Sequence, residues 1–329
     1  MKAFLHALKW AFFVLLALVV GLLIAARYVE FRKSDDELAA LFSEQPVRPT
    51  VHRYQMPDPT GIRTIRFIET PADAARPTII FIHGAPSSLS FFDGFFQDTA
   101  LLNRAQLVAV DRPGYGYSDF GRVEPSIIRQ AELLQPLIDR YRQSPYLVLV
   151  GSSYGGSVAA RLAMNNPARP DGSGVDHVVF VSSALGPGLE RTYPISYWVK
   201  KPPLRWLVPP LLQLANDEKL AHRQALEAIR PDWSKITASI TMLHGQRDEL
   251  VYPTNVAFAR EQLVNARFAE YILPENRHDI VLNKRDYVTE ILLGILERTD
   301  AMQPPKTPPD KVVGNTFVLE DVISTVLKI

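Results

Sequence analysis

Short apolar runs alternate with longer segments of helical period through the middle of the chain. Runs rich in β-branched and other apolar residues predict strands at 64–69, 78–82, 107–110, 147–150, 178–181, 240–243 and 268–273. Segments 127–141, 157–165 and 286–297 have helical period. Because runs this apolar must be buried on both faces, the alternation predicts an α/β fold with a mostly parallel central sheet flanked by helices.

The most strongly apolar segment lies near the start of the sequence. Residues 10–26 contain no charged or strongly polar side chain and are bracketed by Lys2, Lys9 and Arg27. These 17 residues are at the short end for a membrane-spanning helix, and no clean A-x-A cleavage site follows them. We therefore predict an uncleaved N-terminal membrane anchor, a transmembrane helix within 1–33. A cleaved signal peptide and a buried soluble helix are the alternatives.

Charge does not decide the orientation of this anchor. The apolar segment is preceded by the amino terminus, Lys2 and Lys9, and it is followed by Arg27, Arg32 and Lys33, so both sides carry similar positive charge. A very short tail ahead of a large domain favours the signal-anchor topology. We expect a single-pass membrane protein whose folded domain lies outside the cytoplasm.

Breaks in the alternation suggest the domain boundaries. A polar stretch at 34–42, which we expect to be helical, is followed by prolines and predicts a linker at 34–50, with the folded domain beginning near Val51. Between 185 and 235 the alternation stops and several aromatics and prolines appear, which predicts an inserted helical cap. The core is then 51–184 and 236–299. A proline-rich C-terminal tail, 300–329, has no function that we can assign.

Composition narrows the chemistry. The chain has 36 Lys and Arg against 35 Asp and Glu, so no net field would gather nucleic acid. It has no cysteine, which excludes disulfides, thiolate nucleophiles and Cys-ligated zinc. Any covalent chemistry must therefore use an oxygen or nitrogen nucleophile. The sequence does not predict an oligomeric state.

The most informative motif follows the strand at 147–150. Gly151-Ser152-Ser153-Tyr154-Gly155 matches G-x-S-x-G between a strand and a helix. The central residue of such a turn has a strained backbone, so small residues are needed two positions before and after it. Ser153, and not Ser152, is therefore the predicted nucleophile.

Two further segments make the chain similar to the α/β-hydrolase superfamily over about 51–299. One is His83-Gly84-Ala85-Pro86, which resembles the family's H-G-x-P turn, and the other is the 111–118 segment DRPGYGYS, which resembles its D-x-P-G-x-G-x-S loop. The resemblance implies an α/β-hydrolase fold. It also implies an oxyanion hole made by the backbone N–H groups of Ala85 and Tyr154, with His83 and Asp111 in structural roles.

The same resemblance places the acid and the base late in the chain, in the order Ser, Asp or Glu, His. Asp248 lies in a G-x-x-D turn after the strand at 240–243, and His278 follows the last strand. Asp279 is disfavoured as the acid because a residue adjacent to the histidine rarely reaches its Nδ1. The resemblance thus implies a triad of Ser153, Asp248 and His278.

This triad implies a serine esterase that forms an acyl-enzyme. Carbon–carbon bond hydrolases and acyltransferases of the superfamily share the triad and stay open, as does a non-catalytic binding protein of the same fold. No metal or organic cofactor is expected, since no H-E-x-x-H motif or P-loop occurs.

The aromatic residues of the predicted cap indicate a class of substrate. Its aromatic residues lie close to cations in the sequence: Tyr193, Tyr197, Trp198, Trp206 and Trp233 beside Lys200, Lys201 and Arg205. Either these rings fill the contact between cap and core, or they enter the membrane headgroups and admit acyl chains to Ser153. The second reading favours lipid-like or long-chain acyl esters.

Overall fold

A single eight-stranded sheet organises the molecule, whose computed structural model describes residues 2–26, 31–168 and 173–301. The strands are β1 (Thr50–Asp58), β2 (Gly61–Glu69), β3 (Thr78–Ile82), β4 (Gln106–Val110), β5 (Leu147–Ser152), β6 (His177–Val181), β7 (Ser239–Gly245) and β8 (Phe268–Leu273). Their order is β1-β2-β4-β3-β5-β6-β7-β8. β2 is antiparallel to both β1 and β4, and the other pairings are parallel.

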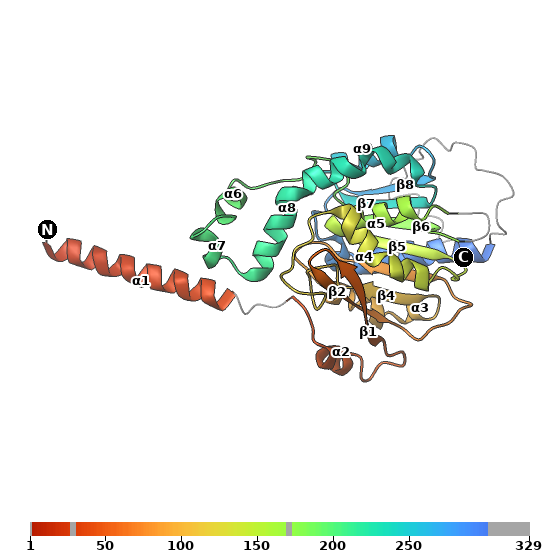
Figure 1. Cartoon of the computed structure of the whole chain (residues 1–329), viewed down its shortest axis with the longest axis horizontal. Helices are drawn as coiled ribbons and strands as arrows, with labels where there is room; N and C mark the ends of the chain where they lie inside the picture. The colour runs from red at the N-terminus through yellow and green to blue at the C-terminus, as the bar shows by residue number, and fades with distance from the viewer. Residues whose placement is uncertain (1, 27–30, 169–172, 302–329) are drawn as a thin grey trace.

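Helices cover both faces of this sheet (Figure 1). The α-helices are α1 (Lys2–Ala26), α2 (Asp35–Leu41), α3 (Thr99–Leu102), α4 (Ile127–Arg140), α5 (Tyr154–Asn165), α6 (Ile195–Val199), α7 (Leu204–Leu207), α8 (Pro210–Ile229), α9 (Thr254–Gln262), α10 (Ile280–Asn283) and α11 (Arg285–Ala301). Three 3₁₀ turns, η1 (Leu89–Phe92), η2 (Phe95–Gln97) and η3 (Arg230–Lys235), complete the set among the described residues.

Side-chain alternation along the central strands builds two cores. In β3, Ile80 and Ile82 belong to one apolar cluster, and Ile79 and Phe81 belong to the other. Every residue of this strand is buried because helices lie over both faces. The predicted fold class, a mostly parallel sheet flanked by helices, is confirmed.

The segment predicted as a linker is packed against the core. Ser34 caps α2 through a capping box, and Leu38 and Phe42 are buried in the second cluster. Just before α2, Lys33 Nζ lies 2.7 Å from Asp93 Oδ2. The folded part therefore begins by Phe31, twenty residues earlier than the sequence pattern suggested.

β1 was hidden from the sequence pattern by Pro57, which lacks the N–H that a central strand needs. The strand lies at the edge of the sheet and pairs only with β2, where a proline is tolerated. Its exposed and half-buried residues alternate, as expected for an edge strand.

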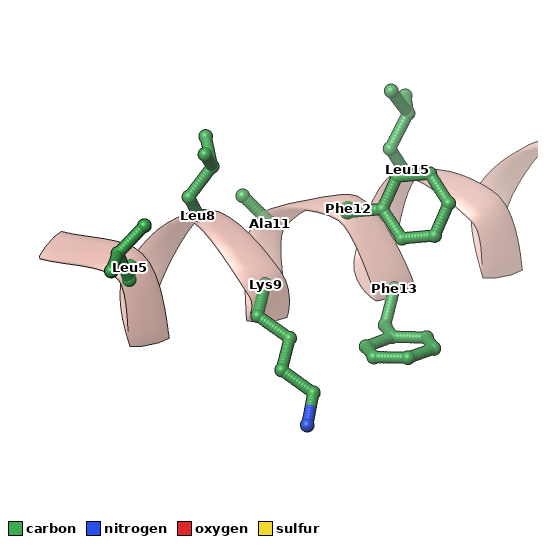
Figure 2. Close-up of a pocket in the computed structure, with 7 residues that line it drawn as sticks. All are labelled: Leu5, Leu8, Lys9, Ala11, Phe12, Phe13 and Leu15. Atoms are coloured by element: carbon green, nitrogen blue, oxygen red, sulfur yellow. The ribbon is translucent and has the colours of Figure 1, made fainter. Parts of the chain in front are cut away.

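α1 is the one described helix long and apolar enough to cross a membrane, over Phe4–Leu22. It extends away from the sheet (Figure 1). Figure 2 shows Leu5, Leu8, Phe12, Phe13 and Leu15 projecting from it, and none of the 4–22 window is buried. Apolar side chains exposed in such numbers are typical of a membrane anchor or a signal sequence.

The inserted segment between β6 and β7 forms α6, α7, α8 and η3. α6 and α7 stand away from the sheet on the side where α1 leaves the body, and α7 contacts α1 (Figure 1). The C-terminal segment 302–329 lies outside the described residues, so the predicted tail is not described beyond Ala301.

Candidate active site

Ser153 occupies the sharp turn between β5 and α5. Its backbone has φ 51° and ψ −120°, outside the ordinary regions for a side-chain-bearing residue. The two motif glycines make the turn possible. A Cβ on Gly151 would lie 2.6 Å from the Gly156 Cα, and one on Gly155 would lie 2.2 Å from the Ile82 carbonyl oxygen. This is the strand-turn-helix context that the motif predicts.

The three residues of the predicted triad meet at the carboxyl ends of β5, β7 and β8. His278 Nε2 lies 3.0 Å from the Ser153 hydroxyl oxygen. His278 Nδ1 lies 2.7 Å from Oδ2 of Asp248. The histidine is half-buried, with 25% of its side chain exposed, whereas the Asp248 side chain is fully buried. The geometry lets the Ser153 hydroxyl donate to His278, and His278 donate to Asp248.

Asp248 is held as a carboxylate. Its second oxygen, Oδ1, accepts from the backbone N–H groups of Leu250 and Val251, each at 2.9 Å. Burial by itself raises the pKa of Asp248, but hydrogen bonding and charge from His278, with the Val251 N–H, lower that pKa below its ordinary value. A charged Asp248 favours the His278 tautomer that carries its proton on Nδ1.

The H-G-x-P turn lies directly against Ser153. A Cβ on Gly84 would be 2.9 Å from the Ser153 Cβ and 3.5 Å from its Oγ. Ala85 is the next residue of this turn, and Tyr154 follows Ser153 at the start of α5. The two predicted oxyanion donors thus belong to the two segments that adjoin Ser153.

His83 and Asp111 have the structural contacts expected of them. His83 is fully buried, donates from Nδ1 to the Gly84 carbonyl and accepts from the Arg112 N–H at Nε2. Burial lowers its pKa well below the ordinary value, so its imidazole is neutral. Asp111 accepts from the N–H groups of Leu89 and Tyr117 and braces its loop.

Two other candidate side chains lie near the triad and have other hydrogen-bond partners. Asp279 is exposed and accepts a hydrogen bond from Asn283. His244 is buried beside Asp248, and its Nε2 donates to the Val251 carbonyl at 2.9 Å. Within 2–26, 31–168 and 173–301, no group of three or more His, Asp or Glu side chains is arranged to hold a metal ion.

Sequence reasoning missed a buried contribution from the cap. Glu218 and His222, four residues apart on α8, are both fully buried and contact Arg112, Tyr154 and their neighbours. The one available signal was their i, i+4 spacing, which places two polar side chains on one helix face.

Comparisons with known proteins identify the family of the chain. The family model described as "Alpha/beta hydrolase family" matches residues 79–306. The chain belongs to the alpha/beta hydrolase family. The resemblance inferred from the motifs is therefore confirmed.

Individual relatives of this family member are distant. A 1-acylglycerol-3-phosphate O-acyltransferase from Arabidopsis thaliana is 31% identical over 128 residues, which are 37% of this chain and 28% of the plant protein. The match thus spans less than a third of that relative's length.

Two solved structures share the fold. An esterase from Exiguobacterium antarcticum aligns with a TM-score of 0.56 at 18% identity and covers 75% of this chain and 100% of its own. A membrane phospholipase A, described as a bacterial virulence factor, aligns with a TM-score of 0.53 at 18% identity and covers 92% of this chain and 100% of its own.

Proposed function

We propose that this family member hydrolyses carboxylic esters through an acyl-enzyme on Ser153. The observation that carries the proposal is the continuous contact from the strained Ser153 through His278 to the buried Asp248, at 3.0 Å and 2.7 Å. A serine hydroxyl is a weak nucleophile, and an adjacent base held by a third group is what activates it.

The first half of the reaction acylates the enzyme. His278 Nε2 takes the Ser153 proton as Oγ attacks the ester carbonyl carbon, and the negative charge collects on the carbonyl oxygen. The N–H groups of Ala85 and Tyr154 stabilise that charge, an effect worth about 3–4 kcal/mol for each donor. The C–O bond then breaks, and the alkoxide leaves with the proton from His278.

The second half restores the enzyme. Water gives a proton to His278 Nε2 and attacks the acyl carbon, and Ser153 Oγ leaves with that proton. Asp248 remains a carboxylate throughout and stabilises the imidazolium that forms in each half. The acid product and the free Ser153 hydroxyl are the result.

Lipid-like or long-chain esters are the substrates that the cap favours. Four of its five aromatic rings are exposed in and beside α6 and α7: Tyr193, Tyr197, Trp198 and Trp206. Trp233, the fifth, is 1% exposed and packs edge-on against Phe258, as expected of a ring that fills the contact between cap and core. Exposed Trp and Tyr beside Lys200 and Lys201 suit the headgroup region of a membrane.

α1 would deliver the domain to that surface. It ends at Ala26, the packed segment begins by Phe31, and α7 contacts α1. We therefore infer a single-pass membrane protein with α6 and α7 at the interface, a reading that the membrane phospholipase of the same fold supports. The domain would lie outside the cytoplasm.

An acyltransferase is the second candidate, because the curated plant relative carries that name. The acyl-enzyme is common to both reactions, and the acceptor distinguishes them. Transfer would give an ester of an added alcohol instead of the free acid.

Substrate preference tests the proposal directly. The full-length chain in detergent micelles is assayed against p-nitrophenyl esters of graded chain length, with and without glycerol or lysophosphatidic acid as acceptor. The proposal expects free acid as the main product and kcat/KM rising from short to long acyl chains. Equal rates for all lengths would remove the lipid-like substrate, and dominant transfer product would favour the acyltransferase.

A further inference from the structure

The cap and the core meet in a buried polar cluster behind the predicted oxyanion hole. At its centre, Glu218 of α8 accepts four hydrogen bonds. Arg112 donates to both carboxylate oxygens at 2.7 and 3.0 Å, Tyr115 donates its hydroxyl at 2.6 Å, and Gln130 donates at 2.7 Å. All four side chains are fully buried.

Arg112 extends this cluster into the turn that precedes Ala85. Its Nε donates to the His83 carbonyl at 2.8 Å, and Nη2 donates to the Gly84 carbonyl at 3.1 Å. With the bonds to Glu218 and one to Gln130, every N–H of the guanidinium has an acceptor. The carboxylate of Glu218 thus fixes the group that holds two consecutive carbonyls of the oxyanion turn.

α8 contacts the second predicted donor one helical turn further on. The His222 ring stacks on the Tyr154 ring, with centroids 4.2 Å apart. His222 Nε2 lies 3.1 Å from the Ser157 hydroxyl, which donates to the Tyr154 carbonyl at 2.7 Å. On its other side, His222 Nδ1 lies 2.8 Å from Glu190 Oε1.

Tyr154 is held from the core as well. The Arg112 guanidinium carbon lies 4.4 Å from the centre of the Tyr154 ring. Burial and the nearby Glu218 raise the pKa of Tyr154 well above its ordinary value, so the phenol stays neutral in this cluster. The residue that carries one oxyanion N–H is therefore clamped between groups from two parts of the fold.

The contribution of the Arg112–Glu218 pair to stability does not by itself explain why the pair is present. A buried ion pair repays its desolvation only when both partners are saturated with hydrogen bonds, and replacing it with apolar residues is often neutral for stability. An oxyanion hole, in contrast, depends on donor positions within a few tenths of an ångström, because its N–H groups must lie about 2.7–3.1 Å from the developing charge.

We propose that Glu218 and His222 of the cap helix α8 are positioning residues for the oxyanion hole, acting through Arg112 on the Ala85 turn and through the Tyr154 ring on the start of α5. This inference rests on the proposed function, since it gives the two backbone donors their placement. The cap is then part of the catalytic apparatus as well as a cover over the site.

Glu218→Gln tests the first arm. It keeps the size of the side chain but removes the charge that pairs with Arg112. Glu227→Gln is the matched control, because Glu227 is an exposed glutamate on the same helix. With full-length protein and p-nitrophenyl butyrate, we expect kcat to fall about 10- to 100-fold in Glu218→Gln, less than the loss of a whole donor. KM should change by less than about threefold, and Glu227→Gln should match wild type.

A transition-state analogue separates positioning from loss of structure. A trifluoromethyl ketone forms a hemiketal oxyanion with the serine, so its Ki should rise in Glu218→Gln by the factor by which kcat/KM falls. The pH profile of kcat/KM should not move, because Glu218→Gln leaves the proton transfer between Ser153 and His278 unchanged. A folded Glu218→Gln enzyme with wild-type kcat and Ki would overturn the first arm.

His222 provides a second test that stands if Glu218→Gln does not fold. His222→Ala removes the ring that packs on Tyr154, whereas His222→Phe keeps a ring there. We expect kcat to fall about tenfold in the alanine variant and to recover in the phenylalanine variant. Equal losses in both, or no loss in either, would contradict the Tyr154 arm. A wild-type chain that neither turns over esters nor reacts with the ketone would instead reject the proposed function and this inference with it.

Discussion

At the scale of single residues, the catalytic proposal depends on three side chains that touch in series. In the proposed reaction the proton passes between Ser153 and His278, and Asp248 holds the His278 ring in place. Ser152, the neighbouring hydroxyl, is buried at the end of β5 and has no contact with His278 among the described hydrogen bonds.

Substitution of these side chains has a graded expected outcome. Ser153→Ala and His278→Ala should abolish ester turnover, and Asp248→Asn should lower kcat about 10⁴-fold by favouring the wrong tautomer of His278. Ser152→Ala should be mild. Rates are measured on purified protein with circular dichroism as the check on folding. Substantial esterase activity in folded Ser153→Ala would refute the assignment.

The pH dependence of activity should report one group. The pKa of Asp248 is lowered, so its carboxylate stays charged through the pH range in which an ordinary aspartate is protonated. Asp248 takes up a proton only at more acidic pH. Burial lowers the pKa values of His83 and His244, and lowers that of His177 to about 3, so these rings are neutral where free imidazole titrates, near pH 6.5.

Because the base must be unprotonated to accept the Ser153 proton, we expect log kcat/KM to rise with pH at a slope of one and then level off. A steady-state profile between pH 5 and 9 gives the answer. A flat profile would argue against a histidine base, and a slope of two would require a second titrating group.

At the scale of elements, the central strands were predictable because burial on both faces leaves an uninterrupted apolar run. β3 begins and ends where the sequence pattern placed it. β8 does so too, although it is an edge strand and only partly buried. α2 lies within the helical stretch that the sequence predicts at 34–42. β1 was not predicted, because an edge strand containing Pro57 carries too weak a pattern.

The site residues also differ in how well the sequence predicts them. Ser153 follows from a local motif, whereas Asp248 and His278 came from the order of residues in a known family, since His278 is 125 positions from the serine it contacts. The pair of Arg112 and Glu218 is 106 positions apart and belongs to no motif, so a single sequence could not reveal it.

The proposed contact of the hairpin of α6 and α7 with the membrane can be tested through its tryptophans. Trp198 and Trp206 are each 68% exposed, whereas Trp233 is buried. In full-length protein reconstituted into vesicles of phosphatidylcholine and phosphatidylglycerol with brominated acyl chains, we expect both exposed rings to be quenched.

Trp198→Phe and Trp206→Phe should each remove part of the quenched emission, beyond the share of Trp10 in α1. Trp233→Phe is the control and should remove only unquenched emission. If Trp198→Phe and Trp206→Phe left the quenched fraction unchanged, the hairpin would not lie at the interface.

At the scale of the whole molecule, the proposed membrane contact would make α1, the hairpin of α6 and α7, and the helix α8 a path from a bilayer surface to Ser153. α1 and the hairpin lie on the same side of the sheet (Figure 1), and α8 begins three residues after α7. On α8, Glu218 reaches the Ala85 turn through Arg112, and His222 packs directly on Tyr154. In the proposed arrangement, this one helix would connect binding of the cap at a bilayer with the chemistry at Ser153.

The most direct test of the central claim is covalent labelling of the nucleophile. Full-length protein is treated with a fluorophosphonate, and the adduct is located by mass spectrometry of the intact chain and its peptides. The account predicts one adduct, on Ser153, absent from folded Ser153→Ala and formed far more slowly in His278→Ala. An adduct on Ser152 or Ser157, or no adduct on a folded chain, would contradict it.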